Sequence, residues 1–215
     1  MTTTVSPART RRFRVRAVPL ALLLAAATYI TWDLFSPRSE DLRDFDPKDV
    51  ARLETKMWRA YSSGEKLPLL FDVAELLRSE YRLPFLRSNL TAFYAARAAF
   101  VFKQSRSRAD CEQALPDLRR FYSVLHEISN QPLDADKAAH LELAWWMLHR
   151  DRSPQLEQAL AALQAEIFHV TPTRVAEHAH YRAEAIRVRD DHGDWGLIAK
   201  LLRQSWSSLA RVLQS

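Results

Sequence analysis

The chain of 215 residues is 47% hydrophobic and carries 31 lysines and arginines against 26 acidic residues, a formal net charge of +5. Five of the arginines precede residue 17, so residues 17–215 are formally neutral and lack the basic surface that a nucleic-acid-binding domain needs. The three glycines do not cluster as a phosphate-binding loop requires, and the single Cys111 excludes an internal disulfide. We therefore expect no nucleic acid partner and no cofactor.

An uncharged, mostly apolar run near the N-terminus predicts a membrane segment. The run covers residues 17–32 and extends to Phe35 if Asp33 reaches the lipid headgroups. A helix needs about 20 apolar residues to cross a bilayer and tolerates about 17, so we expect a transmembrane signal anchor over residues 17–35 that binds the lipid bilayer. The apolar character persists to Phe35, which favours retention of the segment. Three alternatives stay open: a signal peptide cleaved after the alanines at 25–27, a buried soluble helix, or an organellar transit peptide.

The charges that flank this segment predict its orientation. Five arginines and no acid precede the segment: Arg9, Arg11, Arg12, Arg14 and Arg16. After the segment, in residues 38–46, acids outnumber bases. Positive charge remains on the cytoplasmic side of a membrane. We therefore expect residues 1–16 to form a basic cytoplasmic tail and the main domain to lie outside, in the periplasm or the extracellular space.

The rest of the chain predicts an all-α domain. Residues 36–46 are polar and aperiodic, which predicts a short stalk. From residue 47 to 215 apolar residues recur at helical spacing, and aspartate-proline or serine-proline pairs give helix starts. The predicted helices cover 47–63, 67–81, 84–103, 111–128 with a kink or late start at Pro116, 134–149, 153–169, 171–193 and 195–213. No segment alternates with a period of two, so no strand is expected.

We expect an irregular antiparallel bundle of about seven to eight helices. One internal similarity relates residues 74–78 and Tyr81 to residues 199–203 and Trp206. This similarity is compatible with a degenerate helical repeat, although no fixed period of 34 residues is visible.

Four charged residues occupy helix positions whose neighbours at three, four and seven residues are apolar; they are Glu54, Arg97, Glu142 and Arg182. Buried charges are usually paired, so we expect one or two ion pairs between helices, with the forked geometry that arginine allows. Such a network would fix the register of the helices. The alternative is that the same residues line a polar pocket that binds a ligand.

A second group could bind a metal. Glu166 and His169 end one predicted helix, and Glu177 and His180 stand near the start of the next, each pair at Glu-x-x-His spacing. Paired motifs of this kind hold two metals in ferritin-like bundles, but there they lie in the middle of helices that a crossover separates. The alternative is two solvated helix ends, with His169 stabilising a C-terminus.

No nucleophile motif is present, so the sequence does not predict an enzyme. Six tryptophans could anchor a partner as well as fill a core. We expect a non-enzymatic protein-interaction or scaffolding module, with a protein partner of unknown identity, on the non-cytoplasmic face of a membrane. The alternative is a membrane-tethered helical enzyme or a metal or ligand binder.

Overall fold

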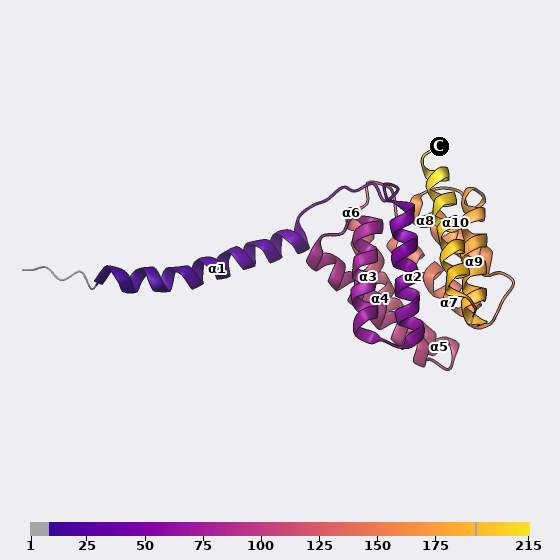
Figure 1. The fold of residues 1–215 in the computed structure, drawn as a ribbon, viewed down its shortest axis with the longest axis horizontal. Helices are drawn as coiled ribbons and strands as arrows, with labels where there is room; N and C mark the ends of the chain where they lie inside the picture. The colour runs from indigo at the N-terminus through magenta and orange to yellow at the C-terminus, as the bar shows by residue number, and fades with distance from the viewer. Residues whose placement is uncertain (1–8, 192) are drawn as a thin grey trace, which may run out of the picture. The chain divides into compact units, whose positions relative to one another are not determined.

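The described part of the chain is entirely helical. The computed structural model describes the backbone of residues 9–191 and 193–215 (Figure 1), and within these residues it contains no β-strand, only an isolated bridge between Glu40 and Ser129. The prediction of an all-α chain is confirmed. The chain divides into two compact units, Met1–Ser36 and Pro37–Ser215.

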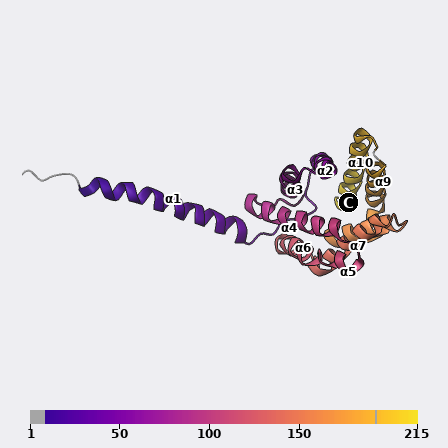
Figure 2. The ribbon, with the colours of Figure 1, turned by 90° about the horizontal axis from the view of Figure 1, so that it is seen from below.

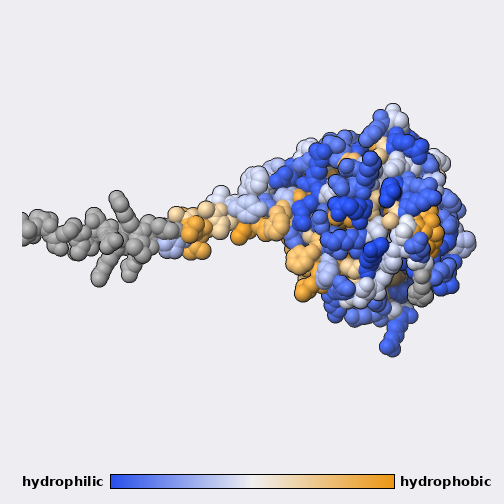
Figure 3. Space-filling view, in the orientation of Figure 1, coloured by the Kyte–Doolittle hydropathy of each residue, from blue (hydrophilic) through white to orange (hydrophobic). Residues whose placement is uncertain are grey.

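The first unit contains one helix, α1, which spans Arg9–Phe35 and covers the predicted membrane segment. Most of its described apolar side chains are exposed, among them Leu20, Leu22, Leu23, Leu24, Ile30, Trp32 and Phe35. Figure 3 shows hydrophobic colouring along this helix. The side chains of Arg9, Arg11, Arg12, Arg14 and Arg16 lie outside the described residues. Within the part of the chain that the structure describes, no helix has both the length and the hydropathy required to span a bilayer.

The second unit begins with an extended segment, residues 37–46, that we call the strap. The sequence predicts a free stalk here, but Leu42 and Phe45 are only 1% and 7% exposed. The backbone N–H of Glu40 donates to the Ile128 carbonyl at 2.6 Å, and the Arg43 guanidinium donates to the Phe168 carbonyl at 2.8 Å. The stalk prediction needs correction because two isolated apolar residues create no period that sequence analysis can detect.

The helices of the second unit begin and end close to the predicted positions because the local capping signals are strong. The Asp46 side chain accepts from the Lys48 backbone N–H at 2.8 Å, the Asp194 side chain accepts from the Gly196 N–H at 2.8 Å, and Gly64 ends α2 with a φ of 73°. The elements are α2 (Pro47–Ser63), α3 (Lys66–Tyr81), α4 (Phe85–Gln104), α5 (Arg108–Glu112), α6 (Leu115–Ile128), α7 (Ala135–Arg150), α8 (Leu156–Phe168), the 3-10 helix η1 (Pro172–Val175), α9 (Ala176–Asp190) and α10 (Trp195–Leu213).

Two predicted helices differ from the observed ones. The segment predicted as one helix over 111–128 forms α5 and α6, because Pro116 lies in the first turn of α6, where a missing N–H is tolerated. The segment predicted from 171 begins with the 3-10 turn η1 and continues as α9.

Eight helices of the second unit form a closed ring. Helices α2, α3, α4, α6, α7, α8, α9 and α10 each pack against the next one in this order, and α10 packs against α2. Seen from below, α2 and α3 stand nearly end-on whereas α4 and α7 run across the view, so the ring consists of inclined helices (Figure 2). The predicted antiparallel bundle is therefore a ring, which leaves space at its centre.

Candidate functional site

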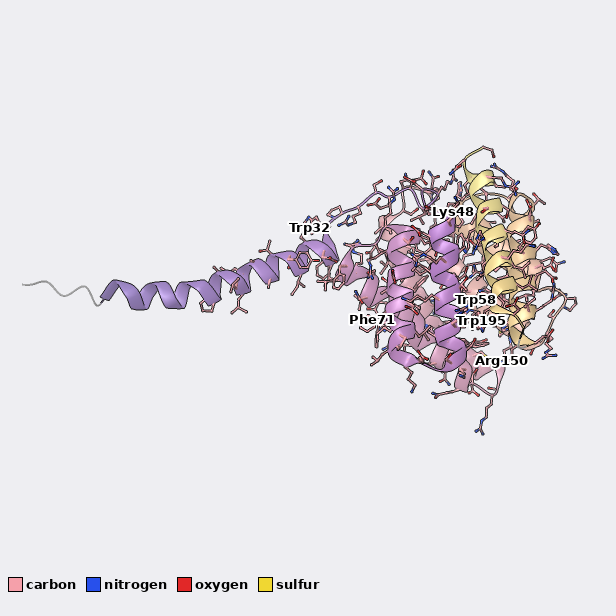
Figure 4. The ribbon with its side chains drawn as sticks, in the orientation of Figure 1. Trp32, Lys48, Trp58, Phe71, Arg150 and Trp195 are labelled. Carbon is pink, nitrogen blue, oxygen red and sulfur yellow. The ribbon has the colours of Figure 1, made fainter. Side chains whose placement is uncertain are left out.

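The ring encloses a cavity of about 280 Å³ that we call the central cavity. Every one of the eight ring helices contributes at least one side chain to its wall. Four tryptophans line it, Trp58, Trp145, Trp146 and Trp206, and Figure 4 marks Trp58 on α2. Its charged and amide side chains are Glu54, Glu80, Glu142, Gln164, Arg182 and Arg189, and His149 and three tyrosines, Tyr61, Tyr81 and Tyr122, also line it. Three acids and two arginines in an otherwise apolar and aromatic space make this the candidate functional site.

The structure brings together two of the four predicted charges, Glu54 of α2 and Arg182 of α9. Arg182 Nη2 lies 2.5 Å from Glu54 Oε1, and Arg182 Nη1 donates to Glu54 Oε2 at 3.1 Å. The indole N–H of Trp206, on α10, donates to Glu54 Oε2 at 2.6 Å. Glu54 is 1% exposed, so this bidentate pair ties three helices together in a site with little water.

Glu142, on α7, faces the same cavity but has no cationic partner within the described residues. Its carboxylate accepts from the Tyr122 hydroxyl at 2.9 Å and from the Trp146 indole N–H at 2.8 Å. Burial raises the pKa of Glu142, while the Tyr122 hydroxyl, the charge of Arg182 and the Trp146 indole oppose this rise. The site thus holds Glu142 with neutral donors.

Glu80, on α3, is a third cavity acid that the sequence analysis missed. It is 6% exposed, and burial raises its pKa from 4.5 to about 8; the charges of Glu54 and Glu142 also raise this pKa, whereas the Tyr81 hydroxyl and Arg182 lower it. The signal was present in the sequence, because Val73, Leu76 and Leu77 stand seven, four and three residues before Glu80. The pattern that identified Glu54 would have identified Glu80.

Two further polar groups on the cavity wall lack a protein hydrogen-bond partner among the described residues. They are the Gln164 side-chain oxygen, in a residue that is 5% exposed, and the Trp145 indole N–H. A buried polar group without a partner costs about 1–3 kcal/mol. The cavity therefore offers hydrogen-bonding capacity that the protein itself does not use.

Arg97, predicted to point inward, lies elsewhere. Its side chain is exposed, its Nε donates to Asp117 at 2.5 Å, and its guanidinium lies 5.4 Å from the centre of the Phe93 ring. The prediction was wrong because α4 turns small residues, Ala95 and Ala99, toward the cavity and leaves Phe93 outside. Sequence analysis had assigned the aromatic side of α4 to the interior.

The structure does not bring the predicted metal ligands together. Glu166 pairs with Lys137 at 2.6 Å, Glu177 pairs with Arg211 at 3.2 Å, and His180 Nδ1 lies 3.4 Å from Glu157. His169 occupies the left-handed cap of α8, with a φ of 49°. The turn between α8 and α9 separates the two motifs because η1 intervenes.

One other carboxylate-histidine group occurs among the described residues. Glu157, His180 and Glu184 place one ligand atom each within 4.8 Å of one another. Arg187 pairs with both acids of this group, with its Nη2 2.9 Å from Glu157. The local charge is thus already compensated, and the group lies apart from the central cavity.

A larger hollow of about 590 Å³ adjoins the central cavity, since both are lined by Tyr61, His149 and Arg189. At this junction Asp190 lies 3.0 Å from Arg189 and 2.6 Å from His149 Nε2, and the Arg189 guanidinium lies 4.8 Å from the Trp58 ring centre. The two hollows therefore meet beside the Trp58 ring.

Comparison of the chain with protein-family models, with curated proteins and with solved structures finds no match.

Replacement of Arg182 by alanine leaves the buried Glu54 without its cation. We expect a loss of about 3–5 kcal/mol in the free energy of unfolding, measured by urea titration with circular dichroism. The double variant Glu54→Leu/Arg182→Met should lose less, because it removes both charges. The control is Arg211→Ala, which breaks an exposed pair with Glu177 and should cost at most about 1 kcal/mol. Equal small losses for Arg182→Ala and Arg211→Ala would contradict a structural role for the buried pair.

The raised pKa of Glu80 predicts a pH-dependent stability. The folded state holds a proton on Glu80 between pH 4.5 and about 8 that the unfolded state releases, so the free energy of unfolding should fall as pH rises through this window. The slope for one proton is at most about 1.4 kcal/mol per pH unit. His178, whose pKa burial lowers from 6.5 to about 3, gives the opposite slope below pH 6.5, so the profiles are compared from pH 6.5 upward, where only the variant separates Glu80 from Glu142, whose pKa burial also raises. Glu80→Gln should flatten the profile there; an unchanged profile would show that another group is responsible.

Proposed function

We propose that this chain is a membrane-anchored, non-enzymatic domain that binds a small molecule at the centre of its helical ring. The observation that carries this proposal is the central cavity, because all eight ring helices line it and its wall holds polar groups that no protein group satisfies. Binding sites are typically apolar and aromatic with a few convergent polar groups, which is the composition found here.

The size of the cavity supports a ligand of moderate size. An engineered, purely apolar cavity of about 150 Å³ stays dry and binds benzene. The central cavity has about 280 Å³, room for a molecule larger than one aromatic ring, and its carboxyl groups would orient such a molecule. The helical ring then serves as a rigid container, since every wall belongs to a regular helix.

Two observations support the proposed membrane anchor: the apolar run in the sequence and the exposed leucines of α1. Leu20, Leu22, Leu23 and Leu24 are 59–68% exposed, as side chains that contact lipid would be. We propose that residues 17–35 hold the domain at a bilayer, with residues 1–16 in the cytoplasm and the ring on the other side, in the periplasm or the extracellular space.

Protein interaction is a second candidate, which one observation favours. Large apolar side chains are exposed on α3 and α4; they are Leu67, Phe71, Phe85, Leu90 and Phe93. Exposed aromatic residues often anchor a partner at an interface. A protein partner would bind this exposed surface, whereas a small molecule would bind the central cavity. The two candidates therefore differ in their site, because the surface is separate from the residues that line the cavity.

The test of ligand binding uses indole, a neutral two-ring molecule, and the full-length chain in lipid nanodiscs. A molecule that binds only the native state stabilises it by an amount that grows with the logarithm of its concentration above Kd, so we expect a concentration-dependent rise in the melting temperature. Ala99→Phe fills the cavity wall and should abolish the rise. Ala176→Phe, at an exposed alanine of α9, is the matched control and should keep it. A rise that is absent in the unmodified chain, or equal in the two variants, would refute binding in the central cavity.

The test of the anchor uses extraction of membranes with alkaline carbonate, which removes peripheral proteins. The full-length chain should stay in the pellet. Leu22→Arg together with Leu24→Arg should release it, because a central arginine costs about 2.5–3.5 kcal/mol in a transmembrane helix. The control places the same charges at Leu67 and Leu197, which are exposed on α3 and α10. Release of the unmodified chain, or of the control, would count against the anchor.

A further inference from the structure

The charges in the central cavity do not balance. Arg182 is compensated by Glu54 at 2.5 Å, and Arg189 is compensated by Asp190 at 3.0 Å. Two carboxyl groups remain, and no lysine or arginine forms an ion pair with either of them in the described residues; they are Glu80 and Glu142. Once the internal pairs are subtracted, two carboxyl groups remain without a paired cation: Glu142, and Glu80, which keeps its proton below about pH 8.

The polar groups of the cavity wall that lack a hydrogen-bond partner also favour a cationic ligand. The Gln164 side-chain oxygen is an acceptor without a partner, and carboxylates accept several hydrogen bonds. Against these acceptors stands one unused donor, the Trp145 indole N–H. A molecule that completes the site must therefore bring more donors than acceptors, which an ammonium group does.

The aromatic walls add a third argument, because their faces attract cations. Trp145 and Trp146 stand at 88° to each other with ring centres 6.2 Å apart, and Phe102 lies 5.2 Å from Trp146. Both indoles line the cavity, and aromatic rings are the groups that bind quaternary ammonium ions in aromatic cages. Within the protein the same walls already face cations, since the Arg182 guanidinium lies 5.8 Å from the ring centre of Trp206.

We propose that the central cavity binds an organic cation, an ammonium group attached to an apolar or aromatic body, with Glu80 and Glu142 as its counter-charges. This inference rests on the proposed ligand-binding function and names the chemical class of the ligand. The ammonium group lies between the two carboxyl groups and the indoles of Trp145 and Trp146. Above about pH 8, where Glu80 is ionised as well, an anion of the same size would meet two uncompensated carboxylates, so the site favours a cation.

The test compares three probes on the full-length chain in nanodiscs by isothermal titration calorimetry. They are benzyltrimethylammonium, whose charge is permanent, the neutral indole, and the anion phenylacetate. We expect the cation to bind at least tenfold more tightly than indole, which corresponds to about 1.4 kcal/mol, and phenylacetate not to bind. Cation binding equal to or weaker than indole binding would overturn the inference.

Two single variants test whether Glu80 and Glu142 cause the preference for the cation. Glu80→Gln and Glu142→Gln should each weaken the binding of benzyltrimethylammonium at least fivefold, and the double variant should remove the preference for the cation. Indole binding should survive in all of them. Loss of cation preference with indole binding intact supports the counter-charge role, whereas an unchanged preference in the double variant refutes it. Failure of every probe would refute the ligand-binding function itself, so the two failures are distinguishable.

A pH titration provides a readout that a purely structural role would not produce. The titratable groups that act on Glu80 are Glu54 of α2, Tyr122 of α6, Glu142 of α7, Arg182 of α9 and its neighbour Tyr81, while the cavity residues of α4 carry no titratable group. Because the charge of benzyltrimethylammonium is permanent, only protein groups titrate. Burial holds the pKa of Glu80 at about 8, so binding of the cation should strengthen as pH rises toward 8, by at most about tenfold per pH unit for one proton. Glu80→Gln should show a flatter profile, and identical profiles would overturn the role of Glu80.

Discussion

Closure of the ring is the constraint on which the rest of this structure depends. Eight helices that each pack mainly against their ring neighbours leave a centre that must be filled by side chains converging from all sides. Here that role falls to large aromatic residues such as Trp58 and Trp206. A space of about 280 Å³ is left, in contrast to the dense packing usual in a protein core.

The buried pair of Glu54 and Arg182 is part of how the ring closes. Glu54 belongs to α2 and Trp206 to α10, the two helices that meet where the ring ends, while Arg182 comes from the neighbouring α9. Each of these groups would be costly to bury alone, and together they satisfy one another. The same pair sets the electrostatic character of the cavity, because it neutralises one acid and leaves the other two without a cation.

Sequence analysis predicted the helices well and their arrangement poorly. Helix ends such as Asp46 and Gly64 follow from local backbone chemistry, which a short stretch of sequence contains in full. The helical offsets also identified Glu54, Glu142 and Arg182 as inward-facing, and would have identified Glu80. They failed at Arg97, because α4 packs with its small residues inward and the period alone does not tell which face is buried. Closure of the ring could not be predicted from the sequence, because it depends on contacts between residues more than a hundred positions apart.

The strap defines where the folded domain starts. Phe45 packs edge-on against Trp206 at 5.4 Å and lies 6.0 Å from Phe168, and Arg43 occupies the carbonyl groups at the C-terminal end of α8. A truncation at the first residue of α2 would therefore expose an indole whose N–H holds Glu54, and would leave the end of α8 uncapped. A shortened protein meant to keep the central cavity intact must therefore include the strap, residues 37–46, ahead of α2.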